Sequence, residues 1–212
     1  LKLSQPHEVE GLTQRALEAL AAAAREAGDA EASAESGPWL LGLDMPRYLP
    51  FLTHANNRSL REKAYRAHVG RASDGELDNR ALIAEILTLR REQSSRLGYA
   101  HWADLSLSAK MADDVPAVEA LLEELRAAAY PAAEQELRDL QAIAREHKAP
   151  KADELAPWDI AYWSEKLRQS RFDLDQEALR PWFPLPQVLE GLFSLCTRLF
   201  DVEIVAADGE AP

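Results

Sequence analysis

Residues 113–147 read "DDVPAVEALLEELRAAAYPAAEQELRDLQAIAREH", and this stretch decides the fold class. Its apolar residues recur every three or four positions, which is typical of an amphipathic helix. They form a single stripe of Val118, Leu121, Leu122, Leu125, Ala128, Ala129, Ala132, Leu137, Leu140 and Ile143. Asp113 or Asp114 can cap this helix, and Pro116 is tolerated in its first turn. The pattern predicts roughly 30 helical residues spanning about 45 Å, with Pro131 expected to kink the helix or split it in two.

The sequence on both sides of this stretch is also helical in pattern. We expect helices over residues 6–27, 46–54, 56–71, 79–98, 158–172 and 185–200. The helix over 79–98 is expected to bury its apolar side chains, Leu82, Ile83, Ile86, Leu87 and Leu89. Two stretches, 39–44 and 201–212, favour short strands. The sequence therefore predicts an all-α fold with minor β content.

Local features refine two of these helices. Asn56 or Asn57 can cap the helix over 56–71, and Leu60, Ala64 and Ala67 share one face that we expect to be buried. Gly98 is expected to adopt the left-handed backbone conformation and so to end the helix over 79–98.

Composition limits the classes of function. The chain has 212 residues, is 47% hydrophobic and carries a formal charge of −12, without a clear basic patch, so we expect no nucleic-acid partner. It has no apolar run of about 18 residues, so we expect no membrane span. A single cysteine, Cys196, favours a reducing compartment and a cytoplasmic location. Because the chain opens with Leu1 rather than Met, we expect that it begins inside a longer protein.

"HEVEG" at residues 7–11 is half of a zinc-protease signature, His-Glu-x-x-His, with Gly11 where the second His would stand. Glycine cannot bind zinc, and no two of the five histidines lie three to five residues apart. The favoured interpretation is an exposed His7 and Glu8 in the first turn of a helix. We therefore predict no catalytic or metal-binding residue in this chain.

Three other groups of residues have an ordinary interpretation and a functional one. Asp74, Glu76 and Asp78 suggest a calcium loop but fit a solvated turn before a helix better. Cys196 lies on an apolar helix face and is expected to be a buried structural thiol rather than a nucleophile. Ion pairing within helices, rather than phosphate binding, is expected of Arg58, Arg61, Arg66, Arg71, Arg90, Arg91 and Arg96.

Residues 158–163 carry an aromatic face. Trp158 and Tyr162 are four residues apart, so both project from the same side of the predicted helix, and Asp159 and Trp163 lie beside them. Packing within the core or between domains is one interpretation. The alternative is an aromatic wall that faces a substrate.

Four stretches, in order and spacing, resemble the thimet oligopeptidase family of zinc metallopeptidases, and most of all its bacterial members. They are "NNRSLREKAYRAHVGRAS" (56–73), "IAEILTLRREQSSRLGYAHWADLSLSAKMA" (83–112), "WDIAYWSEKLRQSRF" (158–172) and "LRPWFPLPQVLEGLFSLCTRLF" (179–200). The resemblance extends from about Trp39 to about Val205. Departures are mild, since Trp163 and Trp182 stand where the family pattern suggests Tyr.

The resemblance implies a zinc enzyme that hydrolyses short peptides inside a deep channel of a mostly helical protein. The family's zinc ligands and its catalytic Glu belong to a His-Glu-x-x-His motif expected downstream of this chain, so the chain alone is expected to be inactive. On this interpretation, residues 1–147 form helical channel wall, 148–157 a linker, and 158–212 the lead-in to the zinc region. Trp158, Asp159 and Tyr162 are the candidates for side chains that line the substrate channel.

Two alternatives remain open from the sequence. The first is a truncated helical module that binds proteins and has no catalytic role. The second is an interaction protein in which the unpaired strand predicted within residues 201–212 associates with another copy of the chain.

Overall fold

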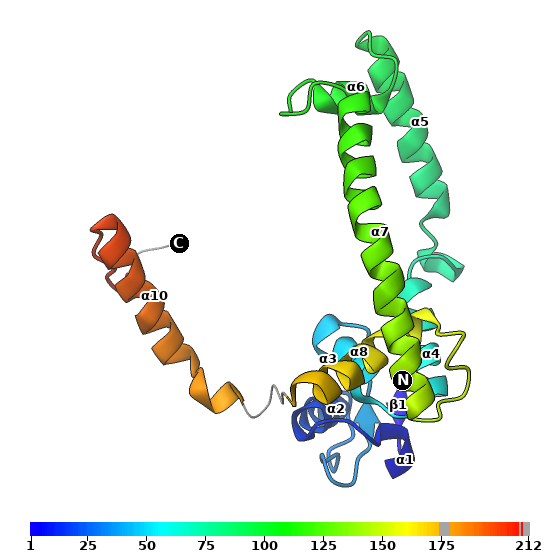
Figure 1. Ribbon diagram of the computed structural model, residues 1–212, viewed down its shortest axis with the longest axis vertical. Coiled ribbons are helices and arrows are strands. Elements are labelled where there is room, and N and C mark those ends of the chain that lie inside the picture. Colours follow the sequence, from blue (N-terminus) through cyan, green and yellow to red (C-terminus); the bar gives the residue numbers. More distant parts are fainter. Residues whose placement is uncertain (174–178, 208, 210–212) are drawn as a thin grey trace. The chain divides into compact units, whose positions relative to one another are not determined.

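The computed structural model describes residues 1–173, 179–207 and 209, and the chain divides into two compact units, Leu1–Leu167 and Arg168–Pro212. Helices dominate both units (Figure 1). The sheet found among the described residues has two strands. The predicted all-α fold with minor β content is therefore confirmed.

The first unit begins with a strand, β1 (Lys2–Leu3), that pairs antiparallel with β2 (Trp39–Leu40). Strand β2 confirms part of the strand predicted at 39–44, whereas β1 has too few residues to show a period in the sequence. Two helices lie between the strands, α1 (Pro6–Val9) and α2 (Gln14–Glu26). The single helix predicted over 6–27 is therefore wrong, because the chain turns sharply between them.

Gly11 causes this break. Its φ of +89° lies in the left-handed region that favours glycine. A Cβ at this position would lie 2.4 Å from the carbonyl oxygen of His54 and 2.6 Å from Oδ1 of Asn56. Glycine is thus required here both for the turn and for the close approach of the chain to the end of α3 (Met45–His54).

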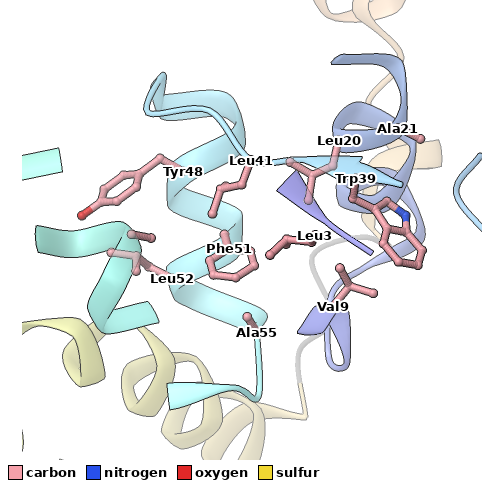
Figure 2. Packing of buried hydrophobic residues seen from close by; sticks show 11 residues of the cluster. Leu3, Val9, Leu20, Ala21, Trp39, Leu41, Tyr48, Phe51, Leu52 and Ala55 are labelled. Atoms are coloured by element: carbon pink, nitrogen blue, oxygen red, sulfur yellow. The ribbon is translucent and has the colours of Figure 1, made fainter. Parts of the chain in front are cut away.

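The main hydrophobic core lies between the sheet, α2 and α3 (Figure 2). Trp39, Phe51 and Leu3 are its largest fully buried apolar side chains, and Leu20 of α2 packs with them. They come from four different elements, so this cluster fixes how the short strands and the helices fit together. Pro46 occupies the first turn of α3, as predicted.

Helix α4 (Arg58–Val69) is capped by Asn57, whose side chain accepts a hydrogen bond from the backbone N–H of Leu60, as the sequence predicted. Ala64 is buried, also as predicted. Ala67 is exposed, contrary to expectation, and Arg61 is buried on the inward face instead. Periodicity alone could not select a charged residue for the interior.

Beyond α4 the chain forms a short turn, η1 (Gly75–Leu77), and then α5 (Arg80–Arg96), α6 (Trp102–Leu107) and α7 (Val115–Glu146) (Figure 1). Helix α6 contacts both α5 and α7. Gly98 has a φ of +81°, as predicted for the end of α5. Helix α7 runs through Pro131 for 32 residues, so of the two predicted outcomes the split is wrong and the kink stays a prediction. Strong helix formers on both sides of Pro131 compensate for the hydrogen bond that proline removes.

The apolar face of α5 is exposed, although we predicted it to be buried. Five of its side chains remain about half exposed or more: Leu82, Ile83, Ile86, Leu87 and Leu89. The stripe on α7 behaves in the same way over Leu121, Leu122 and Leu125. Only its C-terminal end is buried, where a second core forms from Leu140, Ile143, Ala144, Ala152 and Trp163. Residues 148–156 fold back onto α7 there, and α8 (Pro157–Phe172) follows.

The second unit contains the turn η2 (Arg180–Trp182) and the helix α10 (Leu185–Phe200), which confirms the predicted helix over 185–200. The side chain of Cys196 is half-exposed rather than buried, because Leu192, Leu195 and Leu199 around it are exposed too. Residues 201–207 form no strand, so that part of the strand prediction is wrong. The rest of that stretch lies outside the described residues except Gly209. Within the described chain, no helix is both long and apolar enough to cross a bilayer.

Candidate functional site

A buried cluster of charged residues joins α4 to the start of α8. The Asp159 carboxylate accepts hydrogen bonds from Arg58 Nε at 3.0 and 3.1 Å and from Arg58 Nη2 at 2.7 Å. It also accepts one from Arg61 Nη2 at 3.1 Å. The Asp159 and Arg61 side chains are only 1% and 2% exposed. One carboxylate therefore holds two guanidinium groups from the neighbouring helix.

Backbone carbonyl groups accept the other hydrogen bonds of the buried Arg61 side chain. Its Nη1 donates to the carbonyls of Ala55 and Asn56 at 2.7 and 3.2 Å, and its Nε donates to that of Trp158 at 3.1 Å. Burying a guanidinium without partners is very unfavourable, so these contacts explain why the buried position is tolerated. They also tie the end of α3, the start of α4 and the start of α8 to one side chain.

The electrostatics of Asp159 follow from this geometry. Burial disfavours the charged carboxylate, but hydrogen bonds from Arg58, the Ala156 N–H and Arg61 outweigh it, so the pKa of Asp159 lies below its ordinary value. Burial also lowers the pKa of Arg61, against the opposing effect of Asp159. Asp159 is therefore an ion-pair partner at neutral pH and has no spare proton for general acid catalysis.

Two aromatic side chains surround the cluster. The Tyr162 ring lies 4.1 Å from the Arg61 guanidinium carbon, and its hydroxyl donates to Asn56 Oδ1 at 3.1 Å. The Trp158 ring lies 5.6 Å from the guanidinium carbon of Arg58 and 5.0 Å from that of Arg66. The structure thus brings the predicted site residues Trp158, Asp159 and Tyr162 together against α4.

Comparison with protein-family models identifies the matching family as "Peptidase family M3", over residues 51–211. The chain belongs to peptidase family M3. The likeness to thimet oligopeptidases that the sequence suggested is confirmed, because this match covers well over half of the chain.

Individual relatives extend the M3 match almost to the N-terminus. The chain is 47% identical to "Probable cytosolic oligopeptidase A" of Arabidopsis thaliana over 99% of its own length and 30% of the relative's. It is 48% identical to "Organellar oligopeptidase A, chloroplastic/mitochondrial" of the same plant, over 99% of this chain and 26% of that protein. It is 40% identical to "Oligopeptidase A" of Salmonella typhimurium, over 92% of this chain and 28% of that protein. The M3 chain therefore spans less than a third of the length of these curated relatives.

"HEVEG" has a structural explanation in this M3 chain. The Glu8 carboxylate accepts the backbone N–H groups of Ser4 and Gln5 at 2.8 and 2.9 Å, and these bonds lower the pKa of Glu8. His7 is exposed in the same turn, as expected. Glu8 therefore caps a helix, and Gly11 makes the turn that follows.

The described residues of this M3 chain do not form a zinc site. Among residues 1–173, 179–207 and 209, no group of three or more His, Cys, Asp or Glu side chains is arranged to hold a metal ion. These residues do not fit a zinc ion, for which proteins supply at least three ligands. Asp74 and Asp78, considered above as calcium ligands, bond instead to the Gly75 N–H and to Arg80.

Sequence reasoning missed the roles of Arg58 and Arg61. We expected both to pair within their own helix, whereas their partner Asp159 lies 101 and 98 residues away. One signal was present in the sequence. Arg61 stands three residues before the inward-facing Ala64 and therefore shares its helix face.

Proposed function

We propose that this M3 chain is the non-catalytic part of an oligopeptidase A-like metalloendopeptidase that hydrolyses short peptides. The supporting observation is the 40% identity to Oligopeptidase A of Salmonella typhimurium over 92% of the chain. Identity of this extent, together with the family match over residues 51–211, favours the same kind of enzyme over an unrelated helical module.

We propose further that the enzyme is zinc-dependent and that its zinc ligands and general base lie outside residues 1–212. The misfit of the described residues to a metal site supports this placement. The ratio of lengths supports it as well, since the relatives are more than three times as long as this chain. No catalytic step is assigned to residues of this chain, and we expect it to hydrolyse nothing on its own.

Exposed apolar surfaces support the proposed scaffold role. The apolar faces of α5 and α7 carry many exposed Leu and Ile side chains, which proteins rarely leave open to water in such number. A longer enzyme would cover them, so we assign residues 1–147 to a channel wall, 148–157 to the linker, and 158–212 to the lead-in to the zinc region. Trp158 and Tyr162 are proposed as wall side chains. Asp159 is too deeply buried to touch a peptide and would support them instead.

A cytoplasmic location is proposed on two grounds. The chain has a single cysteine, and one relative is named as a cytosolic enzyme. The name of the organellar relative suggests import into an organelle as the alternative. Localisation of a tagged full-length protein would distinguish the two locations.

The decisive experiment compares this chain with the product of the whole open reading frame. Both would be purified and assayed with an internally quenched short peptide, and their bound zinc would be measured by mass spectrometry. We expect stoichiometric zinc and hydrolysis only for the longer protein. A stop codon directly after Pro212 would favour the protein-binding module, and zinc-dependent hydrolysis by the chain alone would contradict the placement of the metal site.

The wall assignment has its own test in the longer enzyme. Tyr162→Phe removes the hydrogen bond to Asn56 but keeps the ring, whereas Tyr162→Ala removes both. If Tyr162 faces substrate, the alanine variant raises KM for the peptide more than the phenylalanine variant does. Unchanged kinetics with a lower melting temperature would assign Tyr162 to packing alone.

A further inference from the structure

We propose that Arg58, Arg66 and Trp158 form a binding site for the carboxylate group of a short peptide. The inference rests on the proposed function for the nature of its ligand. Its physical basis is a local excess of positive charge beside an aromatic ring that has an unused hydrogen-bond donor.

The positive charge comes from an imbalance within the buried cluster. Asp159 supplies one negative charge for the two positive charges of Arg58 and Arg61. Arg61 is enclosed, but the Arg58 side chain is 27% exposed. Its Nη1 group has no hydrogen-bond partner within the described part of the chain. The uncompensated charge is therefore presented to solvent through Arg58, on a protein whose net charge is otherwise −12.

Trp158 carries a second arginine. Arg66 lies over the ring, within the distance at which a cation is attracted to an indole face. Its side chain is 66% exposed, and its ion pair with Glu62, at 2.8 Å, lies within one helix on the surface. Such exposed pairs contribute little free energy, so another anion can replace Glu62 at small cost.

The Trp158 indole supplies the third feature. Its Nε1–H group is buried and has no acceptor among the described residues. A buried donor without an acceptor is unfavourable, because it has lost its hydrogen bond to water, so a ligand that supplies the acceptor gains affinity. A carboxylate held between Arg58 and Arg66 would lie beside the Trp158 ring, where one of its oxygens can serve as the acceptor for this donor.

The chemistry favours a carboxylate over other ligands. Guanidinium groups bind carboxylates through paired hydrogen bonds, and the indole N–H adds a single donor that one carboxylate oxygen can satisfy. A polyanion such as a nucleic acid would be repelled by the acidic chain as a whole. Peptides carry carboxylates at the C-terminus and on Asp and Glu side chains, and either source would suit the site.

The test is binding to the chain labelled with 15N at its five tryptophans, read from the indole N–H signals by NMR. Trp158→Phe identifies the Trp158 signal. The probes are N-acetylglycine, which has a terminal carboxylate, N-acetylaspartic acid α-amide, which has only a side-chain carboxylate, and the neutral N-acetylglycinamide. We expect one or both acids to shift the Trp158 signal with saturation, and the neutral amide to leave it unchanged. The acid that binds more tightly identifies the source of the carboxylate, either a C-terminus or a side chain.

Two variants control for non-specific attraction. Arg66→Gln should weaken binding of the acids about tenfold or more, the effect of one hydrogen bond between charged groups. Arg126→Gln should leave binding unchanged, although Arg126 is likewise exposed, paired with a glutamate of its own helix and near an aromatic ring. Equal shifts with the neutral amide, no saturable shift with either acid, or equal weakening by both variants would overturn the proposal. This experiment measures binding and not hydrolysis, so its result can be interpreted even if the proposed enzyme activity is not found.

Discussion

Arg61 and Asp159 are 98 residues apart in the sequence, yet Arg61 Nη2 lies 3.1 Å from Asp159 Oδ1 in the interior of the first unit. This contact joins helix α4 to helix α8 across the whole of α5, α6 and α7. Both side chains are almost fully enclosed. If one of them is removed, water cannot take its place as the partner of the other.

Asp159→Ala should therefore be among the most destabilising single substitutions in the chain. Removing one partner leaves a buried charge without compensation, which typically costs about 3–5 kcal/mol of the free energy of unfolding. Urea denaturation followed by circular dichroism would measure the loss. The matched control is Asp153→Ala, which breaks an exposed ion pair with Arg145 and should cost less than about 1 kcal/mol. Equal effects of the two substitutions would contradict this account of the cluster.

Acid should weaken the same contact. The pKa of Asp159 is lower in the folded chain than in the unfolded one, so the unfolded state takes up a proton first as the pH falls. The contribution of Asp159 is fully present above its ordinary pKa of about 4 and is lost as the pH falls through its lower folded value. The stability difference between wild type and Asp159→Asn should therefore shrink as the pH falls from about 5 through the lowered pKa of the folded state. Urea titrations across this range measure it, and a difference that is constant or grows in acid would be the opposite result.

Gly11→Ala should destabilise the chain far more than Gly28→Ala. Both glycines have a positive φ, +89° and +106°, so both variants carry the strain of an alanine in that conformation, about 1 kcal/mol or somewhat more. Only at Gly11 would the new Cβ meet the chain, at 2.4 Å from the His54 carbonyl oxygen, whereas nothing lies within 4 Å at Gly28. We expect an additional loss of at least about 2 kcal/mol at Gly11. Similar melting temperatures for the two variants would show that the approach to His54 is easily relaxed.

A comparison of Phe51→Ala with Leu87→Ala shows how differently the packed core and the exposed face of α5 contribute to stability. Phe51 is fully buried in the first core, so its truncation should cost about 3–5 kcal/mol. Leu87 is exposed on α5, and its truncation in this chain should change the free energy of unfolding by less than about 0.5 kcal/mol. Chemical denaturation of both variants provides the comparison. A large loss for Leu87→Ala would mean that the α5 face is covered in solution, for example by a second copy of the chain.

Most of the helices were predictable because their signals are local. The cap at Asn57, the proline in the first turn of α3 and the left-handed Gly98 each act within a few residues. The break at Gly11 was missed because the apolar period continues across it. Part of what requires glycine at this break is the nearby carbonyl of His54, more than 40 residues away.

The candidate site was only half predictable. The aromatic spacing of Trp158 and Tyr162 marks one face of α8, and their common location against α4 agrees with it. The partners of Asp159 could not be found in the same way, because many arginines lie within helices that also contain glutamates. Any of those arginines can pair within its own helix.

The sequence by itself determined the family, the helical class and, to within about two residues, the boundaries of most long helices, since these depend on residue order and on interactions within a turn or two. It did not predict the short helix α6 or the break between α1 and α2. Only the tertiary structure decided which charges are buried, which apolar faces are covered and where the chain must turn. Those outcomes depend on pairs such as Arg61 with Asp159 and Gly11 with His54. Such pairs meet only after distant segments have packed, and a local pattern carries no information about what will lie on the other side of a contact.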